Sequence, residues 1–206
     1  MHPPHDVVAV AGPPLRLGIV VGSTRPGRLG PAVAAWTRRV GAAHLRRAAP
    51  GTSLELLDVA DFGLPLLDWP APAVLGMASR ARTRRWAEAV EACDGFVFVT
   101  PEYNHRLPGA LRTTIDFVVD EWKDKVAGVV SYGPHGARAV EHLREVLAEL
   151  SVVDAPTAVA LDLVRDFAGD PLAPTDRHRG ALNCMLDEIV RSILTLRELR
   201  REAMVT

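Results

Sequence analysis

The sequence predicts a doubly wound α/β fold, in which helices cover both faces of a five-stranded parallel sheet with strand order 2-1-3-4-5. Short apolar runs alternate five times with segments that repeat apolar residues at helical spacing. The buried runs are rich in β-branched residues, as is typical of parallel strands covered on both faces. The 206 residues suffice for one domain and contain no internal repeat or linker.

The first half of the chain supplies two strands and two helices. The apolar run Leu17–Val21 predicts a buried strand, and a helix is expected from about Pro31 to the Pro-Gly pair at 50–51. A second strand is expected over Ser53–Val59, followed by a loop over Ala60–Gly76. The next helix, Met77–Ala92, carries arginines at 80, 82, 84 and 85, a face that would contact solvent or bind an anion.

The second half repeats the alternation. Strands are expected over Gly95–Thr100, Lys125–Ser131 and Ser151–Leu161. Helices are expected from Pro108, from the loop at 132–136 up to Leu150, and over Asp176–Arg200. Pro156 interrupts the last strand, which is therefore expected at an edge of the sheet, because proline cannot donate to a strand ladder. Residues 1–14 are rich in proline and predict a disordered arm ahead of one domain over residues 15–206.

Three unusual loops follow the first, third and fourth strands. They are Gly22–Gly30, Pro101–Arg106 and Ser131–Gly136. In a sheet of order 2-1-3-4-5 the carboxyl ends of these strands lie side by side at the topological switch point, where ligands bind. The sequence therefore predicts a site formed by all three loops.

The first loop suits a phosphate. Free N–H groups and the helix dipole favour an anion at the start of the following helix. Ser23 and Thr24 add hydroxyl donors, and Arg25 and Arg28 add planar cationic groups. Neither G-x-x-x-x-G-K-[ST] nor G-x-G-x-x-G is present, so a single phosphate is expected rather than a dinucleotide. A plain strand-to-helix turn with solvated arginines would look the same.

The other two loops suit a flat ring. Tyr103, Asn104 and His105 offer an aromatic surface beside amide and imidazole groups, and the third loop offers glycines and backbone N–H groups. A phosphate at one end and a flat heteroaromatic ring at the other describe a mononucleotide, and flavin mononucleotide (FMN) fits best. Such N–H groups near the pyrimidine end would stabilise negative charge on the reduced ring.

Composition excludes several other classes. The net charge of -1 favours neither nucleic acid nor an anionic membrane as a partner, and no apolar run approaches a membrane span. The N-terminus lacks the features of a secretory signal. Cys93 and Cys184 form no C-x-x-C motif, so neither a disulfide framework nor a zinc site is indicated, and a cytoplasmic location is expected.

Three motifs, in this order and spacing, resemble the NADPH-dependent FMN reductase family. They are GSTRPGR, PEYNHRLPGALRTTIDF and EWKDKVAGVVSYGPHG. The resemblance covers about residues 15–150 and implies a flavodoxin-like fold. It implies that Ser23 and Arg25 hold the FMN phosphate. It also implies that two groups of residues lie along the isoalloxazine from opposite sides: Pro101, Glu102, Tyr103 and Asn104, and Ser131, Tyr132 and Gly133.

The chain departs from the family pattern at two places. Many members have a second serine where Arg28 stands, often followed by an asparagine near Gly30, so here a cation and the amides of Leu29 and Gly30 would substitute. Many members also carry a small or polar residue where Leu107 precedes Pro108, which bears on the preferred acceptor.

Several of these residues have structural alternatives. Tyr103 could cap the edge of the core, and Glu102 could be a solvated acid or an anion at a helix start. Asn104 could be a turn residue, and His105 is read as a loop donor rather than a proton-transfer group. His135 could contact the flavin or face solvent. The segment of Trp122, Lys123 and Asp124 could shape a dimer or form an exposed connection.

The predicted function is that of a flavoenzyme. Hydride passes from NADPH or NADH through FMN to a small acceptor, which could be a flavin, a quinone, an azo compound or a metal oxyanion. No protein nucleophile and no metal are expected, the kinetics should be ping-pong, and the assembly should be a homodimer or a dimer of dimers. The alternative is a non-enzymatic FMN-binding electron carrier or redox sensor.

Overall fold

One parallel sheet forms the centre of the protein, whose computed structural model describes residues 13–65, 77–133, 137–167 and 172–203. The strands are β1 (Arg16–Val21), β2 (Ser53–Asp58), β3 (Gly95–Pro101), β4 (Val126–Gly133), β5 (Val153–Asp154) and β6 (Val159–Asp162). Their order is β2-β1-β3-β4-β5, and β6 also pairs with β4. The predicted doubly wound sheet and its order are confirmed.

The expected fifth strand is split into two short pieces. Both pair with β4 in parallel, β5 beside Val126 and β6 beside Val130. Between them the amide of Thr157 donates to the carboxylate of Glu188 at 2.9 Å instead of to a strand neighbour, and the Thr157 hydroxyl donates to the same carboxylate at 2.7 Å. Pro156 thus interrupts the edge strand as predicted. The Glu188 carboxylate of the last helix accepts the hydrogen bond from the Thr157 amide that a neighbouring strand would otherwise accept.

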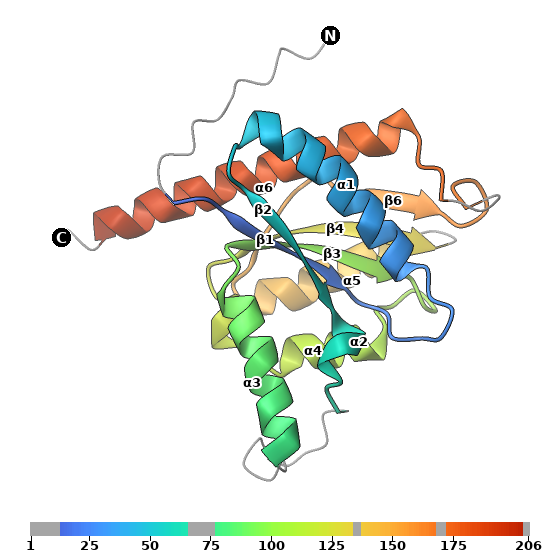
Figure 1. Ribbon diagram of the computed structural model, residues 1–206, viewed down its shortest axis with the longest axis horizontal. Coiled ribbons are helices and arrows are strands. Elements are labelled where there is room, and N and C mark those ends of the chain that lie inside the picture. The colour runs from blue at the N-terminus through green and yellow to red at the C-terminus, as the bar shows by residue number, and fades with distance from the viewer. Residues whose placement is uncertain (1–12, 66–76, 134–136, 168–171, 204–206) are drawn as a thin grey trace.

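Helices cover both faces of the sheet (Figure 1). They are α1 (Gly30–Ala48), α2 (Val59–Phe62), α3 (Met77–Glu91), α4 (Gly109–Asp116), the 3-10 turn η2 (Asp120–Trp122), α5 (Ala137–Glu149) and α6 (Asp176–Ala203). Helices α1 and α6 pack on one face, and α3, α4 and α5 lie on the other. Right-handed crossovers between parallel strands produce this arrangement.

The core on the α3 face is aromatic. Trp122 packs edge-to-face on Phe96, with ring centroids 4.9 Å apart, and its indole N–H donates to the carbonyl of Ile115 at 3.1 Å. The indole of Trp86 donates to the carbonyl of Thr114 at 2.9 Å. Trp122 is 0% exposed. The Trp122 ring therefore belongs to this core.

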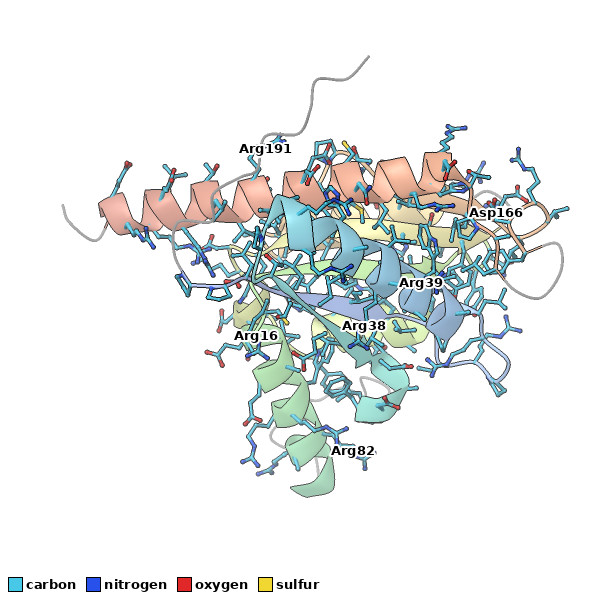
Figure 2. The ribbon with its side chains drawn as sticks, turned by 45° about the horizontal axis from the view of Figure 1, so that its top comes forward. Arg16, Arg38, Arg39, Arg82, Asp166 and Arg191 are labelled. Carbon is cyan, nitrogen blue, oxygen red and sulfur yellow. The ribbon has the colours of Figure 1, made fainter. Side chains whose placement is uncertain are left out.

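The arginine-rich face of α3 is partly structural. Arg82, which Figure 2 shows projecting from α3, donates to the carbonyl of Gly63 at 2.7 Å. Arg85 donates to the carbonyl of Asp61 and lies over the ring of Phe62. These bonds satisfy carbonyls at the end of the short helix α2. The two arginines therefore fasten α2 to α3.

The third and fourth strands run further than the sequence indicated. Their pairing continues to Pro101 and Tyr132, and the amide of Glu102 then donates to the carbonyl of Tyr132 at 3.0 Å. Ser131, Tyr132 and Gly133 therefore belong to β4 rather than to a loop. The remainder of the third loop, Pro134–Gly136, lies outside the described residues, and His135 with it.

Candidate functional site

The connections that follow β1 and β3 meet at the carboxyl edge of the sheet. The amide of Gly22 donates to the carbonyl of Val99 at 2.9 Å. The hydroxyl oxygens of Ser23 and Tyr103 are 2.9 Å apart and share a hydrogen bond. The guanidinium of Arg25 lies over the Tyr103 ring, with its central carbon 5.0 Å from the ring centroid. Below, Gly22–Gly30 is called the first turn and Pro101–Arg106 the second turn.

Arg28 holds the first turn to the neighbouring strand. Its guanidinium donates to both carboxylate oxygens of Asp58, at 2.6 and 2.8 Å, and also to the carbonyl of Ser23. Both partner side chains are 18% exposed, and the hydrogen bonds to Asp58 raise the pKa of Arg28. Asp58 also accepts from the amide of Ala60 and so caps α2. One carboxylate thereby joins the first turn to α2.

The N-terminus of α1 faces this turn without a cap. Among the described residues no side chain caps it, and its first turn contains no acidic residue. Thr24, Arg25 and Leu29 are exposed, whereas Ser23 and Gly30 are buried. Unpaired N–H groups of a 19-residue helix beside the exposed Arg25 suit an anion.

Tyr132 carries a buried hydroxyl beneath the start of α1. Its side chain is 4% exposed and packs near Phe167 on the α1 side of the sheet. The hydroxyl makes no hydrogen bond of normal geometry within the described structure, although the amide of Gly30 faces it. Burial raises the pKa of this phenol above its usual value. The buried hydroxyl and the helix N-terminus together make this part of the sheet edge polar.

The second turn is tight and strained. Tyr103 and Arg106 exchange both backbone hydrogen bonds, each at 3.0 Å. Asn104 and His105 between them have φ values of 47° and 63°. Two successive left-handed residues are typical of a type I′ turn, in which asparagine is favoured and histidine is unusual. The turn thereby exposes both side chains at the edge of the sheet.

Glu102 is the buried anchor of the second turn. Its side chain is 3% exposed, and one carboxylate oxygen accepts the amides of Arg138 and Ala139 at the start of α5, at 3.2 and 3.3 Å. The other carboxylate oxygen lies 3.2 Å from Nδ1 of His105. Of the alternatives for Glu102, the structure supports the anion at a helix start. A side chain on Gly133 would crowd Glu102 near its backbone, because an added Cβ would lie 3.1 Å from Cβ of Glu102.

The predicted site residues fall into three groups by exposure. Arg25, Leu29, Asn104 and His105 are exposed, and Arg28 and Tyr103 are half-buried. The others are buried and mainly build the edge of the sheet: Ser23, Gly30, Pro101, Glu102, Ser131, Tyr132 and Gly133. Ser131, for example, donates to the carbonyl of Val159 at 3.4 Å. Asp58 was missed, although its place at the carboxyl end of β2, beside β1, was a signal that could have found it. A carboxylate at that place can reach the first turn.

Three cavities accompany these elements. One of about 370 Å³ lies beside Thr24, between α2 and α4. A groove of about 270 Å³ contains His105, Arg106 and the side of α5. A third cavity, of about 560 Å³, lies where β6 meets the start of α6, near Asp166, which Figure 2 labels. In the described ranges no group of three or more histidine, cysteine or acidic residues could hold a metal ion, and no helix is apolar enough over its length to cross a membrane.

Comparison with known proteins adds the following findings. The sequence profile of the NADPH-dependent FMN reductase family matches residues 15–166. An NAD(P)H-dependent FMN reductase of Schizosaccharomyces pombe is 33% identical over 171 residues, covering 80% of this chain and 83% of that protein. A Saccharomyces cerevisiae protein of the same description is 35% identical over 145 residues, covering 67% and 76%. A 2-hydroxy-1,4-benzoquinone reductase of a Burkholderia species is 31% identical over 147 residues, covering 68% and 73%.

Solved structures show the same fold. FerB, a flavoenzyme NAD(P)H:(acceptor) oxidoreductase from Paracoccus denitrificans, has a TM-score of 0.68 at 22% identity, covering 87% of this chain and 97% of that one. The apo form of an NADH:FMN oxidoreductase has a TM-score of 0.64 at 22% identity, covering 86% and 89%. The flavodoxin-like fold expected from the sequence is confirmed.

Proposed function

Because the chain belongs to the NADPH-dependent FMN reductase family, we propose that it oxidises NADPH or NADH and passes the electrons through FMN to a quinone or a free flavin. The family uses NAD(P)H and FMN, and the protein is an oxidoreductase of this class. One observation carries the assignment of the site. The uncapped N-terminus of α1 lies beside two turns joined through Ser23 and Tyr103.

The residues present fit FMN. Arg25, the hydroxyl of Ser23 and the amides of Leu29 and Gly30 would hold the phosphate, supported by the exposure of Arg25 and the missing cap of α1. Arg28 would contribute through the shape of the turn, since Asp58 already occupies its guanidinium. The unsatisfied hydroxyl of Tyr132 supports a polar ligand at the same place.

The second turn and the end of β4 would flank the ring. Tyr103 offers a half-exposed aromatic surface beside the exposed side chain of Asn104, and the backbone of Tyr132 and Gly133 would follow from the other strand. When bound, FMN supplies the redox chemistry, because it accepts a hydride from NAD(P)H and returns two electrons to an acceptor. The protein binds, orients and partly shields the ring.

Donor and acceptor would use one open side in turn. The sequence lacks a G-x-G-x-x-G dinucleotide cradle, which supports approach of the nicotinamide from the open edge. Two molecules that need the same surface cannot occupy it together, so the kinetics should be ping-pong. Double-reciprocal plots of NADPH against a quinone should give parallel lines. Intersecting lines would show two separate sites.

We also propose a two-fold homodimer, or a dimer of dimers, that covers the open edge near Tyr103. Cyclic dimers are the commonest soluble assemblies, and an edge site on an open sheet needs cover to exclude water. Of the expected loop over 60–76, residues 66–76 lie outside the described ranges. The two free thiols, Cys93 and Cys184, agree with a cytoplasmic location. Light scattering of the FMN-loaded protein should give at least twice the chain mass, and a monomer mass would contradict the dimer.

Anaerobic stopped-flow mixing tests the function. Protein loaded with FMN is mixed first with NADPH and then with a quinone, while flavin absorbance is followed. We expect rapid bleaching and then return of colour over many cycles. A protein that binds FMN but is not bleached by either nicotinamide would be a carrier or a sensor. A protein that does not bind FMN would contradict the whole assignment.

A further inference from the structure

The second turn contains a histidine whose orientation is fixed by a buried carboxylate. Nδ1 of His105 lies 3.2 Å from Oε1 of Glu102. The two side chains differ in surroundings, since that of His105 is 51% exposed and that of Glu102 is 3% exposed. With Nδ1–H donated to the carboxylate, Nε2 is the atom through which the exposed ring exchanges a proton.

Glu102 cannot follow a moving imidazole. Its backbone amide donates to β4, at the carbonyl of Tyr132, and its second carboxylate oxygen accepts two amides of α5. The backbone at His105 is equally constrained, because its φ of 63° lies inside a closed turn. A histidine held by a third group in this way is the arrangement that general acids use. Strained backbone of this kind is also typical of functional turns.

We propose that His105, which the sequence indicated as a loop donor only, is the proton donor for the acceptor, and that Glu102 positions it. The inference rests on the proposed function, in which a quinone takes up two electrons. The quinone receives one hydride equivalent, whose two electrons come from NAD(P)H, and becomes a hydroquinone anion. The imidazolium N–H bond of His105 then breaks at Nε2 and an O–H bond forms on the anion. Water then returns a proton to Nε2 of the exposed imidazole. The Nδ1–H group stays hydrogen-bonded to the Glu102 carboxylate throughout.

The titratable and charged groups around His105 belong to two elements. Glu102 and Arg106 come from the second turn, and the side of α5 adds Arg138, Glu141, His142 and Glu145 around the same groove. His142 is engaged differently, since its Nδ1 accepts the amide of Leu107 at 3.3 Å.

The test separates acceptors that need a proton from one that does not. Wild type and His105→Asn are loaded with FMN, reduced anaerobically with one equivalent of NADPH and mixed with benzoquinone or with ferricyanide, which takes an electron and no proton. Asparagine tolerates the left-handed backbone at this position. We expect His105→Asn to slow reoxidation by benzoquinone by about 100-fold while ferricyanide rates stay within about twofold of wild type.

Further measurements on the same variants and on two others complete the test. The solvent isotope effect on the benzoquinone step should disappear in His105→Asn, and added imidazole should restore part of the rate. The FMN dissociation constant of the variant should equal that of wild type, which is a readout independent of turnover. His142→Asn, from the same groove, should behave as wild type with both acceptors. Glu102→Gln should slow benzoquinone more than ferricyanide, as expected of a positioning residue.

The outcomes are distinguishable. Equal slowing with both acceptors would mean that His105 acts on the flavin or on the turn, and would overturn the proposal. Unchanged benzoquinone rates would overturn it as well. If NADPH does not reduce the wild-type protein at all, the proposed function fails before the question of the proton donor is reached.

Discussion

The first and second turns are each held in place by one charged side chain, which is a cation in the first turn and an anion in the second. In the first, the cation Arg28 is tied down by Asp58 of the neighbouring strand, and a second cation, Arg25, is presented outward. In the second, the anion Glu102 is tied down by the amides of α5, and His105 is presented outward. Each turn therefore has one charged residue that builds it and one residue whose side chain is exposed at the edge of the sheet.

The two turns differ in the groups that bind the charged side chain. The first turn is fixed by an ion pair between side chains that are 18% exposed, which links it to β2 and α2. The second is fixed by backbone amides and by its left-handed residues, around a carboxylate that water scarcely reaches. The comparison teaches that neighbours within one motif, such as Arg25 and Arg28, need not share a role.

The largest effect is expected from the outward residue of the first turn. Arg25→Ala should weaken FMN binding by roughly 1.5–3 kcal/mol, the scale of a charge-assisted hydrogen bond. Riboflavin, which lacks the phosphate, should bind wild type and variant equally. Fluorescence titration of the apo-protein with both flavins measures this. An unchanged FMN dissociation constant would remove Arg25 from the phosphate site.

The inner residue of the second turn should act on stability. Glu102→Gln removes the charge from a carboxylate that accepts two amides and an imidazole, and should lower the free energy of unfolding by about 1.5 kcal/mol. Urea denaturation of the apo-protein measures this loss. His105→Asn is the matched control and should cost less, because its ring is half exposed. Equal losses for the two variants would erase the distinction between inner and outward residues.

Tyr132 tests whether the protein keeps a buried polar group near the two turns at a cost in stability. Tyr132→Phe removes a buried unsatisfied hydroxyl and should stabilise the apo-protein by about 1 kcal/mol. Because burial raises the folded pKa of Tyr132, the unfolded chain loses the phenol proton first, and stability falls as the pH rises through that range. Tyr132→Phe should reduce this alkaline loss. Urea titrations at neutral and alkaline pH measure both effects, and destabilisation at neutral pH would contradict the account.

The smallest effect is expected away from both turns. Arg82→Ala removes one exposed hydrogen bond to Gly63 and should cost about 0.5 kcal/mol of stability without changing FMN binding. Thermal unfolding and flavin titration measure the two quantities. A loss of FMN affinity would show that α2 shapes the first turn more strongly than the Asp58 contact suggests.

Much of the fold could be predicted from the sequence because its signals are local. Apolar runs and helical spacing gave the strands, their order and the break at Pro156, and the motifs gave the edge where the turns meet. The exact ends of β3 and β4 could not be read, because the polar residues there continue the ladder through backbone bonds that any residue can make.

The roles of charged residues were harder to predict because their partners are distant in sequence. Asp58 lies thirty positions from Arg28, and the amides that bind Glu102 belong to a helix that begins at Ala137. Trp122 shows the same limit, since nothing local indicated that its ring would fill the core. The fold topology could be predicted to bring the two turns together, but only side-chain geometry distinguished the charged residues that hold a turn in place from those that are exposed.

The most direct test of that separation is urea denaturation of three apo-proteins: wild type, Arg28→Gln and Arg25→Gln. Loss of the largely buried pair with Asp58 should lower the unfolding free energy of Arg28→Gln by roughly 1–2 kcal/mol. The exposed Arg25 forms no ion pair with any residue in the described ranges, so Arg25→Gln should have the same free energy of unfolding as wild type. The account would be contradicted if Arg28→Gln were as stable as wild type, or if Arg25→Gln lost as much stability as Arg28→Gln. Arg28 could then not be distinguished as a structural residue from Arg25 as the proposed ligand contact.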